Sequence, residues 1–315
     1  MDLVVCVPAR NEAARLPTLL EALAAQSLGR QTLAGQMTGR QIEVVIALNN
    51  TTDNSLEIVE NARSDYRGHL RIHIENATFA PDLAHAGSAR RLAMNTGLAL
   101  LSRPQDGILV STDADTRPPP QWLDATVSAF ARGADVVGGR IVIDSCEEMP
   151  HEVAALRRAQ DAYWDAVREI EDVLDPLPWN PAPRHGDHTG ASLALRGGLY
   201  ARCGGVPLLR SGEDRALVAA ATACGGRLAH PADVFTFVSS RRDGRAEGGM
   251  AQAMQEIFDL AASGRPLRMP DFGHWRERAL WRRRLRARPG GQMRIAQEEQ
   301  LLPPMPSDMI LDILP

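Results

Sequence analysis

The chain has 315 residues, of which 44% are apolar and 23% are charged, and its formal net charge is -4. This composition excludes a disordered chain, and the length allows one large domain or a domain with a smaller extension. Acidic and basic residues are interspersed, so the charge gives no reason to expect nucleic acid as the main partner.

The cysteines and the first residues bear on the cellular compartment. Four cysteines are scattered along the chain without a C-x-x-C pair, which favours free thiols in a reducing compartment over a zinc or redox site. They are Cys6, Cys146, Cys203 and Cys224. The first apolar run is too short for a signal peptide, and no segment has the length of a membrane span. We therefore expect a cytoplasmic protein.

The first half of the sequence alternates the patterns of buried strands and of helices. Short apolar runs rich in Val and Ile predict strands, and apolar residues at helical spacing predict helices between them. The predicted strands cover residues 3–7, 42–48, 71–74, 108–110 and 134–143, and the predicted helices cover residues 16–23, 55–63, 86–101, 121–131 and 147–173. This alternation predicts an α/β fold with a mostly parallel sheet flanked by helices.

Polar residues follow three of the predicted strands at the point where each strand ends. Residues 8–12 follow the first strand, residues 49–53 follow the second, and Asp113 and Asp115 follow the fourth. Ligands of open parallel sheets bind at the carboxyl ends of the strands, so we expect these segments to line one crevice. Two carboxylates one residue apart offer oxygen ligands to a divalent cation and leave positions for phosphate oxygens. The sequence therefore predicts a nucleotide diphosphate site, with a solvated turn as the less favoured interpretation of the two aspartates.

These motifs, in this order, resemble the family-2 glycosyltransferases with the GT-A fold, over roughly residues 2–240. Residues 7–12 (VPARNE) resemble the opening motif of the family, and the resemblance implies nucleotide contacts for Pro8, Arg10 and Glu12. Asp53 matches the acidic position that contacts the nucleobase, although it is equally suited to cap the helix that follows.

The resemblance continues through the predicted donor site. Residues 87–97 resemble the segment whose basic residue faces the nucleotide, which implies this role for Arg90 or Arg91. Asp113 and Asp115 match the Asp-x-Asp (DXD) motif of the family, with Asp113 toward the ribose and Asp115 as a ligand of Mn²⁺ or Mg²⁺. Some GT-A enzymes use a late histidine as a further ligand. His230 is therefore a candidate, although packing at the start of a strand is the favoured interpretation.

An acidic pair completes the motif set. Residues 188–207 resemble the acceptor-side segment of the family and lead into Glu213 and Asp214, which match its acidic pair at a helix start. The resemblance implies that Asp214 is the catalytic base and that Glu213 helps to bind the acceptor. The alternative is that both carboxylates only stabilise a helix N-terminus through its dipole.

After a predicted domain of residues 1–240, the sequence changes character. Residues 241–315 are expected to form a C-terminal extension with a flexible basic loop, an amphipathic helix and a Pro-rich tail. The glycine-rich loop carries Arg241, Arg242 and Arg245, which are suited to close on a diphosphate or to face solvent. Residues 274–288 contain seven arginines. Their pattern is typical of a helix on an anionic membrane or, in the favoured interpretation, of a solvated helix or a dimer contact.

The resemblance implies a metal-dependent, inverting glycosyltransferase of the hexosyltransferase class, which moves a sugar from a nucleotide-sugar donor to a hydroxyl acceptor. We expect UDP rather than GDP in the donor. The chain lacks the Q-x-x-R-W motif of processive relatives, so we expect transfer of a single sugar. The alternatives are a retaining GT-A transferase with a phosphoglycerate-type acceptor, a sugar-phosphate nucleotidyltransferase, and a non-catalytic nucleotide-sugar binding protein. The acceptor and the oligomeric state do not follow from the sequence.

Overall fold

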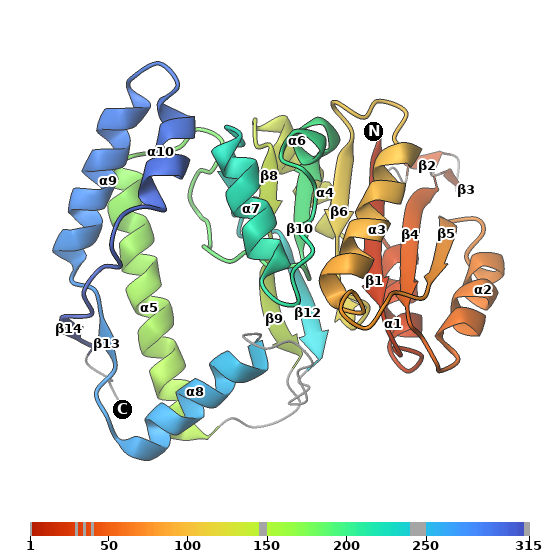
Figure 1. The fold of residues 1–315 in the computed structure, drawn as a ribbon, viewed down its shortest axis with the longest axis horizontal. Coiled ribbons are helices and arrows are strands. Elements are labelled where there is room, and N and C mark those ends of the chain that lie inside the picture. Colours follow the sequence, from red (N-terminus) through yellow and green to blue (C-terminus); the bar gives the residue numbers. More distant parts are fainter. Residues whose placement is uncertain are drawn as a thin grey trace.

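A seven-stranded sheet forms the centre of the molecule (Figure 1), in the strand order β11-β8-β10-β6-β1-β4-β5. The computed structural model describes residues 2–28, 31–33, 36–38, 41–144, 150–239 and 250–311. The strands of the central sheet are β1 (Leu3–Ala9), β4 (Ile42–Asn49), β5 (Leu70–Ala77), β6 (Ile108–Ser111), β8 (Val136–Gly138), β10 (Leu193–Arg196) and β11 (Leu228–Ala229). A short hairpin of β2 (Gln31–Leu33) and β3 (Gln36–Thr38) precedes β4.

Four adjacent strands of this sheet, β6, β1, β4 and β5, are parallel, and β10 is antiparallel to both of its neighbours. This arrangement confirms the predicted α/β fold with a mostly parallel sheet. The chain runs from β1 outward to β4 and β5 and then returns to β6 on the other side of β1. The carboxyl ends of β1 and β6 therefore meet at a topological switch point, where ligands of such sheets bind.

Both faces of the central sheet are buried under helices. Val5 and Val7 of β1 belong to the core on one face, and Val4 and Cys6 belong to the core on the other. A strand buried on both faces has no polar side, which explains its continuous apolar sequence. The first core includes α1 (Leu16–Ala24), α2 (Ser55–Asp65) and α4 (Trp122–Ala131), and the second includes α3 (Ala86–Leu100), α6 (Gly197–Arg202) and α7 (Glu213–Ala223).

The single strand predicted at residues 134–143 is wrong, because two strands of different sheets occupy this stretch. The chain leaves the central sheet after β8 and continues as β9 (Arg140–Asp144) in a three-stranded sheet with β7 (Thr116–Arg117) and β12 (Phe235–Ser239). Gly139 lies between the two strands, and its N–H donates to the carbonyl of Ser192 at 2.8 Å. A Cβ atom at Gly139 would overlap the Ser192 side chain, so the close approach requires glycine.

The C-terminal elements lie around a long helix, α5 (His151–Leu174), beside the sheet (Figure 1). They are α8 (Met250–Ser263), β13 (Arg268–Met269), α9 (Phe272–Arg286), α10 (Gly291–Glu299) and β14 (Met309–Ile310). The predicted amphipathic helix is α9, which packs against α5 and α10. Trp275 of α9 donates from its indole N–H to the Tyr163 hydroxyl of α5 at 2.6 Å, and Phe272 stacks on the same tyrosine.

Part of the charge of α9 is used inside the molecule. Arg282 pairs with Glu171 of α5 and with Glu299 of α10, and Arg286 pairs with Asp175. The ion pairs of these two partly buried arginines attach the extension to α5, an arrangement that the sequence pattern did not indicate. None of the described helices has the length and apolarity that crossing a membrane requires.

Candidate active site at the strand ends

One buried arginine joins side chains from several segments at the switch point. Arg90 lies in the second turn of α3 and is 4% exposed. Its Nε donates to Glu213 at 3.1 Å, and its Nη2 donates to Asp113 at 2.8 Å. Its Nη1 donates to the Ser111 hydroxyl at 2.6 Å and to the carbonyl of Gly190 at 2.9 Å. Burial opposes the charge, but the carboxylates of Asp113 and Glu213 outweigh it and raise the pKa of the guanidinium, which therefore stays charged.

The acidic pair lies at the first turn of α7, and its two members face different groups. Glu213 is 6% exposed and is turned inward against Arg90. Asp214 is half-buried. It accepts from the Gly190 N–H at 2.8 Å through Oδ2 and from the Arg215 N–H at 2.7 Å through Oδ1. A carboxylate has about four lone-pair sites, so these two hydrogen bonds leave Asp214 with free sites that can accept a proton from another group.

Asp113 and Asp115 lie in the turn that follows β6. Asp113 uses Oδ1 for Arg90, yet its side chain remains 37% exposed, and Asp115 is half-buried. Among the described residues no group of three or more His, Cys, Asp or Glu side chains is arranged to hold a metal. Magnesium and similar hard cations are commonly held by one or two carboxylates, with waters and substrate phosphates as the other ligands. The two aspartates therefore fit a cation whose coordination is completed by a nucleotide diphosphate.

His230 lies in a cluster of three histidines. Its Nε2 is 3.2 Å from Nδ1 of His188, whose ring stacks on it, and its ring centroid is 5.7 Å from that of His185. Burial lowers the pKa of all three imidazoles, that of His185 to about 4, so the rings are neutral at pH 7. The cluster gives His230 a partner in the protein, and its role as a metal ligand stays a prediction.

Hydrogen bonds connect the loops after β1 and β4, which are expected to hold the nucleobase. Asn11, at a φ of 52°, accepts from the Thr52 N–H at 2.8 Å. Asp53 accepts from the Ala13 N–H at 3.0 Å, and from the N–H and hydroxyl of Ser55 at 3.0 and 2.6 Å. Its slight burial raises the pKa, but the hydrogen bonds from Ser55 and Ala13 outweigh this effect and lower it. Asp53 thus accepts from the Ser55 N–H at the start of α2 and links the loop after β1 to the loop after β4.

The other predicted donor-site residues lie in or beside these loops. Pro8 is buried in β1, and Arg10 is exposed and donates to the carbonyl of Ala84 at 2.9 Å. The Glu12 N–H donates to the Ser55 hydroxyl at 3.0 Å. Nucleotide contacts for these residues stay predictions. Arg241, Arg242 and Arg245 lie outside the described residues.

Sequence reasoning missed Ser111 and Gly190, which bind Arg90, and it did not separate Arg90 from Arg91. Arg91 donates to the carbonyl of Val206 at 2.8 Å, so the two arginines point in different directions, as adjacent helical residues must. Ser111 is the last residue of a buried strand and lies two residues before Asp113. A polar residue at the end of an apolar strand was the sequence feature that could have indicated Ser111 as a site residue.

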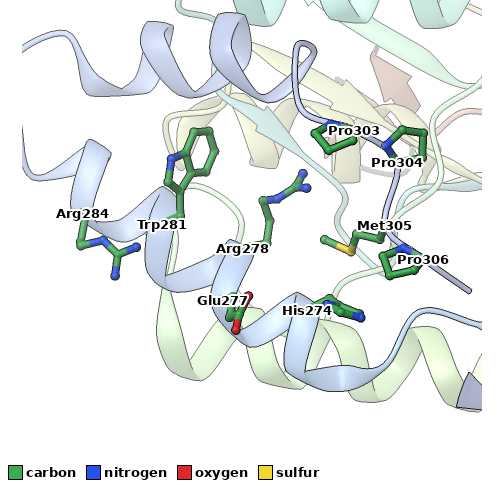
Figure 2. Close-up of a pocket in the computed structure, with 9 residues that line it drawn as sticks. All are labelled: His274, Glu277, Arg278, Trp281, Arg284, Pro303, Pro304, Met305 and Pro306. Carbon is green, nitrogen blue, oxygen red and sulfur yellow. The ribbon is translucent and has the colours of Figure 1, made fainter. Parts of the chain in front are cut away.

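A pocket outside this site lies within the C-terminal extension. Figure 2 shows it between α9 and residues 303–306, with a volume of about 360 Å³. Its lining residues are His274, Glu277, Arg278, Trp281, Arg284, Pro303, Pro304, Met305 and Pro306. None of these residues belongs to the strand-end site.

Residues 4–155 match the family model described as Glycosyl transferase family 2. A curated relative is the undecaprenyl-phosphate 4-deoxy-4-formamido-L-arabinose transferase of Pectobacterium carotovorum subsp. carotovorum (strain PC1), which is 25% identical over 134 residues. That alignment covers 42% of this chain and 35% of the relative, so the chain spans about a third of the relative's length. The family match confirms the resemblance that the motifs indicated.

Solved structures of glycosyltransferases share the fold. TarS of S. aureus (residues 1–349, with UDP-GlcNAc) gives a TM-score of 0.52 at 17% identity, over 95% of this chain and 78% of TarS. The mannosyltransferase PcManGT of Pyrobaculum calidifontis, with GDP-Man and Mn²⁺, gives 0.54 at 19% identity, over 94% and 73% of the two chains. GalNAc-T7, with UDP, GalNAc and Mn²⁺, gives 0.53 at 12% identity, over 95% and 55%. At these identities the likeness establishes the fold alone.

Proposed function

The chain is a family-2 glycosyltransferase with a GT-A fold, and from this premise we propose that it transfers single sugars from a nucleotide diphosphate donor to an acceptor hydroxyl, with inversion at the anomeric carbon. One observation carries the proposal. Arg90 binds Asp113, on the donor side, and Glu213, the neighbour of Asp214, so that carboxylates suited to the two halves of the reaction share one guanidinium.

Asp214 is the proposed catalytic base. As the acceptor oxygen attacks the anomeric carbon, its proton passes to a carboxylate oxygen of Asp214, and the bond between that carbon and the diphosphate breaks. The hydrogen bonds from Gly190 and Arg215 hold the carboxylate in one orientation while it stays half-buried. A base fixed in this way avoids the cost of being ordered during the reaction.

Asp113 and Asp115 are the proposed ligands of Mn²⁺ or Mg²⁺. The cation supplies positive charge that stabilises the departing diphosphate. Asp113 keeps its orientation through its bond to Arg90, and its exposed part is available to a cation or a ribose. His230 is an optional further ligand, which requires its contact with His188 to open.

We propose UDP rather than GDP as the nucleotide, with Asp53 and the connected loops after β1 and β4 as the base site. The absence of the Q-x-x-R-W motif supports transfer of one sugar per acceptor.

A cytoplasmic location is supported by Cys6, Cys203 and Cys224, which are free thiols among the described residues. If the chain contacts an anionic membrane, the exposed arginines of α9 are the residues suited to that contact, among them Arg276 and Arg284.

Thermal unfolding with nucleotides tests the proposal. The wild type and Asp115→Ala are each melted with UDP, GDP, TDP or CDP, with and without Mn²⁺, because a ligand that binds only the folded state raises the melting temperature. We expect a shift with UDP that needs Mn²⁺ and is lost in the variant. If none of the four nucleotides raises the melting temperature, the proposed donor site is contradicted. If a nucleotide raises it but no UDP-sugar releases UDP, the chain is a non-catalytic binding protein.

A further inference from the structure

We propose that Arg90 is a positioning residue that sets the spacing between the donor-side carboxylate Asp113 and the catalytic base Asp214. This inference rests on the proposed function and deepens it. It replaces the sequence-based expectation that Arg90 contacts the nucleotide.

The contacts of Arg90 form a continuous path from one carboxylate to the other. Its Nη2 holds Asp113, and its Nη1 holds the carbonyl of Gly190, whose own N–H holds Asp214. The Ser111 hydroxyl also donates to the carbonyl of Gly190, at 3.2 Å. A second link runs from Nε of Arg90 to Glu213, which neighbours Asp214 in α7. Both links must shift if the distance between Asp113 and Asp214 is to change.

The packing around Arg90 leaves this arrangement little freedom. A Cβ atom built at Gly190 would overlap the guanidinium of Arg90, so the glycine lets backbone and side chain approach closely. Arg90, Ser111 and Glu213 are all buried. Close-packed interiors transmit displacements and do not absorb them, so a change at Arg90 reaches both carboxylates.

The same contacts argue against donor binding by Arg90. A guanidinium has five N–H groups, and the four bonds to Glu213, Asp113, Ser111 and Gly190 use four of them. With 4% of its surface exposed, Arg90 presents almost nothing to a phosphate. Arginine suits the positioning role because its planar fork directs donors along several fixed directions, whereas lysine concentrates three donors on one nitrogen.

The test compares Arg90→Lys with Arg282→Lys as a matched control. Arg282 also pairs with two glutamates, Glu171 and Glu299, but it lies in the extension, outside the site. Release of UDP is measured with water as the acceptor. The donor is whichever of UDP-glucose, UDP-galactose or UDP-N-acetylglucosamine stabilises the wild type most. Melting temperature is recorded for every variant.

A displacement of about 1 Å in reacting groups costs about 100-fold in rate. We therefore expect Arg90→Lys to lower kcat about 100-fold with the donor KM changed by less than about 5-fold. Arg282→Lys should lower the melting temperature without this loss. Two results would overturn the proposal. A lower melting temperature with kcat unchanged would leave Arg90 a structural residue, and a raised donor KM with kcat unchanged would make it a donor ligand.

A stability cycle gives a second readout that needs no substrate. Asp113→Asn, Glu213→Gln and their double variant are unfolded in urea, each with Arg90 present and with Arg90→Met. With Arg90 present, the double variant should lose more free energy of unfolding than the sum of the single losses, because only the double variant removes both carboxylates that pair directly with the buried arginine. With Arg90→Met, the losses should add.

Additive losses with Arg90 present would contradict the link between the two carboxylates. The two readouts also separate this inference from the proposed function. A wild type that releases no UDP refutes the proposed function, and the stability cycle still reports whether Arg90 joins Asp113 to Glu213.

Discussion

Gly190 and Asp214 are joined by a 2.8 Å hydrogen bond from the glycine N–H to the carboxylate, and the carbonyl of the same glycine accepts from Arg90. A glycine thus connects the proposed base to the buried guanidinium. Gly190 lies between the two acidic motifs in the sequence and is hydrogen-bonded to Asp214 directly and to Asp113 through Arg90.

Gly190→Ala should damage the site more than its size suggests. The added methyl group would overlap the Arg90 guanidinium, and overpacking of this kind costs about 1–3 kcal/mol. Urea unfolding should show that loss, and UDP release should fall with it. Gly68→Ala is the control, because a Cβ atom there meets nothing within 4 Å. Equal stability of the two variants would mean that Arg90 moves aside freely.

Asp214→Asn should separate turnover from donor binding. The amide cannot accept the acceptor proton as a carboxylate does, and loss of a general base costs about 100- to 10,000-fold in rate. Asp113 and Asp115 are unchanged in this variant, so the stabilisation by UDP and Mn²⁺ should persist. Melting curves and UDP release on the same preparation check both parts.

The control for this substitution is Asp82→Asn, which makes the same chemical change in an exposed turn and should keep the turnover of the wild type. Unchanged turnover in Asp214→Asn would remove Asp214 as the base and favour the retaining alternative. Loss of both turnover and UDP binding would instead place Asp214 in the donor site.

The histidine cluster should make stability fall in mild acid. Burial lowers the pKa of His185 to about 4, below the ordinary value of about 6.5. Between these values the unfolded chain binds more protons than the folded one, so the free energy of unfolding decreases as the pH falls through that window. His185→Asn keeps an acceptor for the Asp187 N–H and removes the titration.

We expect this variant to lose less stability than the wild type between pH 7 and pH 5, by about 2 kcal/mol. Urea unfolding at the two pH values measures the difference. His69→Asn, at an exposed position, is the control and should keep the pH dependence of the wild type. An identical pH dependence in all three proteins would show that His185 does not titrate in this window.

Asp53→Ala should weaken the joint between the loops after β1 and β4. The carboxylate accepts from the Ser55 N–H at the start of α2 and also from the Ala13 N–H. Loss of such hydrogen bonds costs about 1 kcal/mol. Because its pKa is lowered in the folded state, the contribution of Asp53 is present at neutral pH and is lost as the pH falls below its unfolded value, about 3.9. Asp82→Ala, in an exposed turn, serves as the control in urea unfolding at pH 7.

Much of the fold was predictable from the sequence because the local patterns agree with the tertiary arrangement. A strand buried on both faces must be apolar throughout, and β1 and β4 are largely so. The strand predicted at residues 134–143 failed because its apolar pattern continues across Gly139, while only the contact with Ser192 reveals where the chain changes sheets.

The sequence by itself determined the alternation of strands and helices, the strand ends that carry the polar motifs, and the family resemblance. Only the tertiary structure decided which of two adjacent arginines is buried, and that Arg90 of α3 binds both Asp113 and Glu213, the latter 123 positions away in α7. The physical reason is that hydrophobic periodicity is local and is written in neighbouring residues, whereas the pairing of a buried charge depends on groups that the folded chain brings together from distant segments.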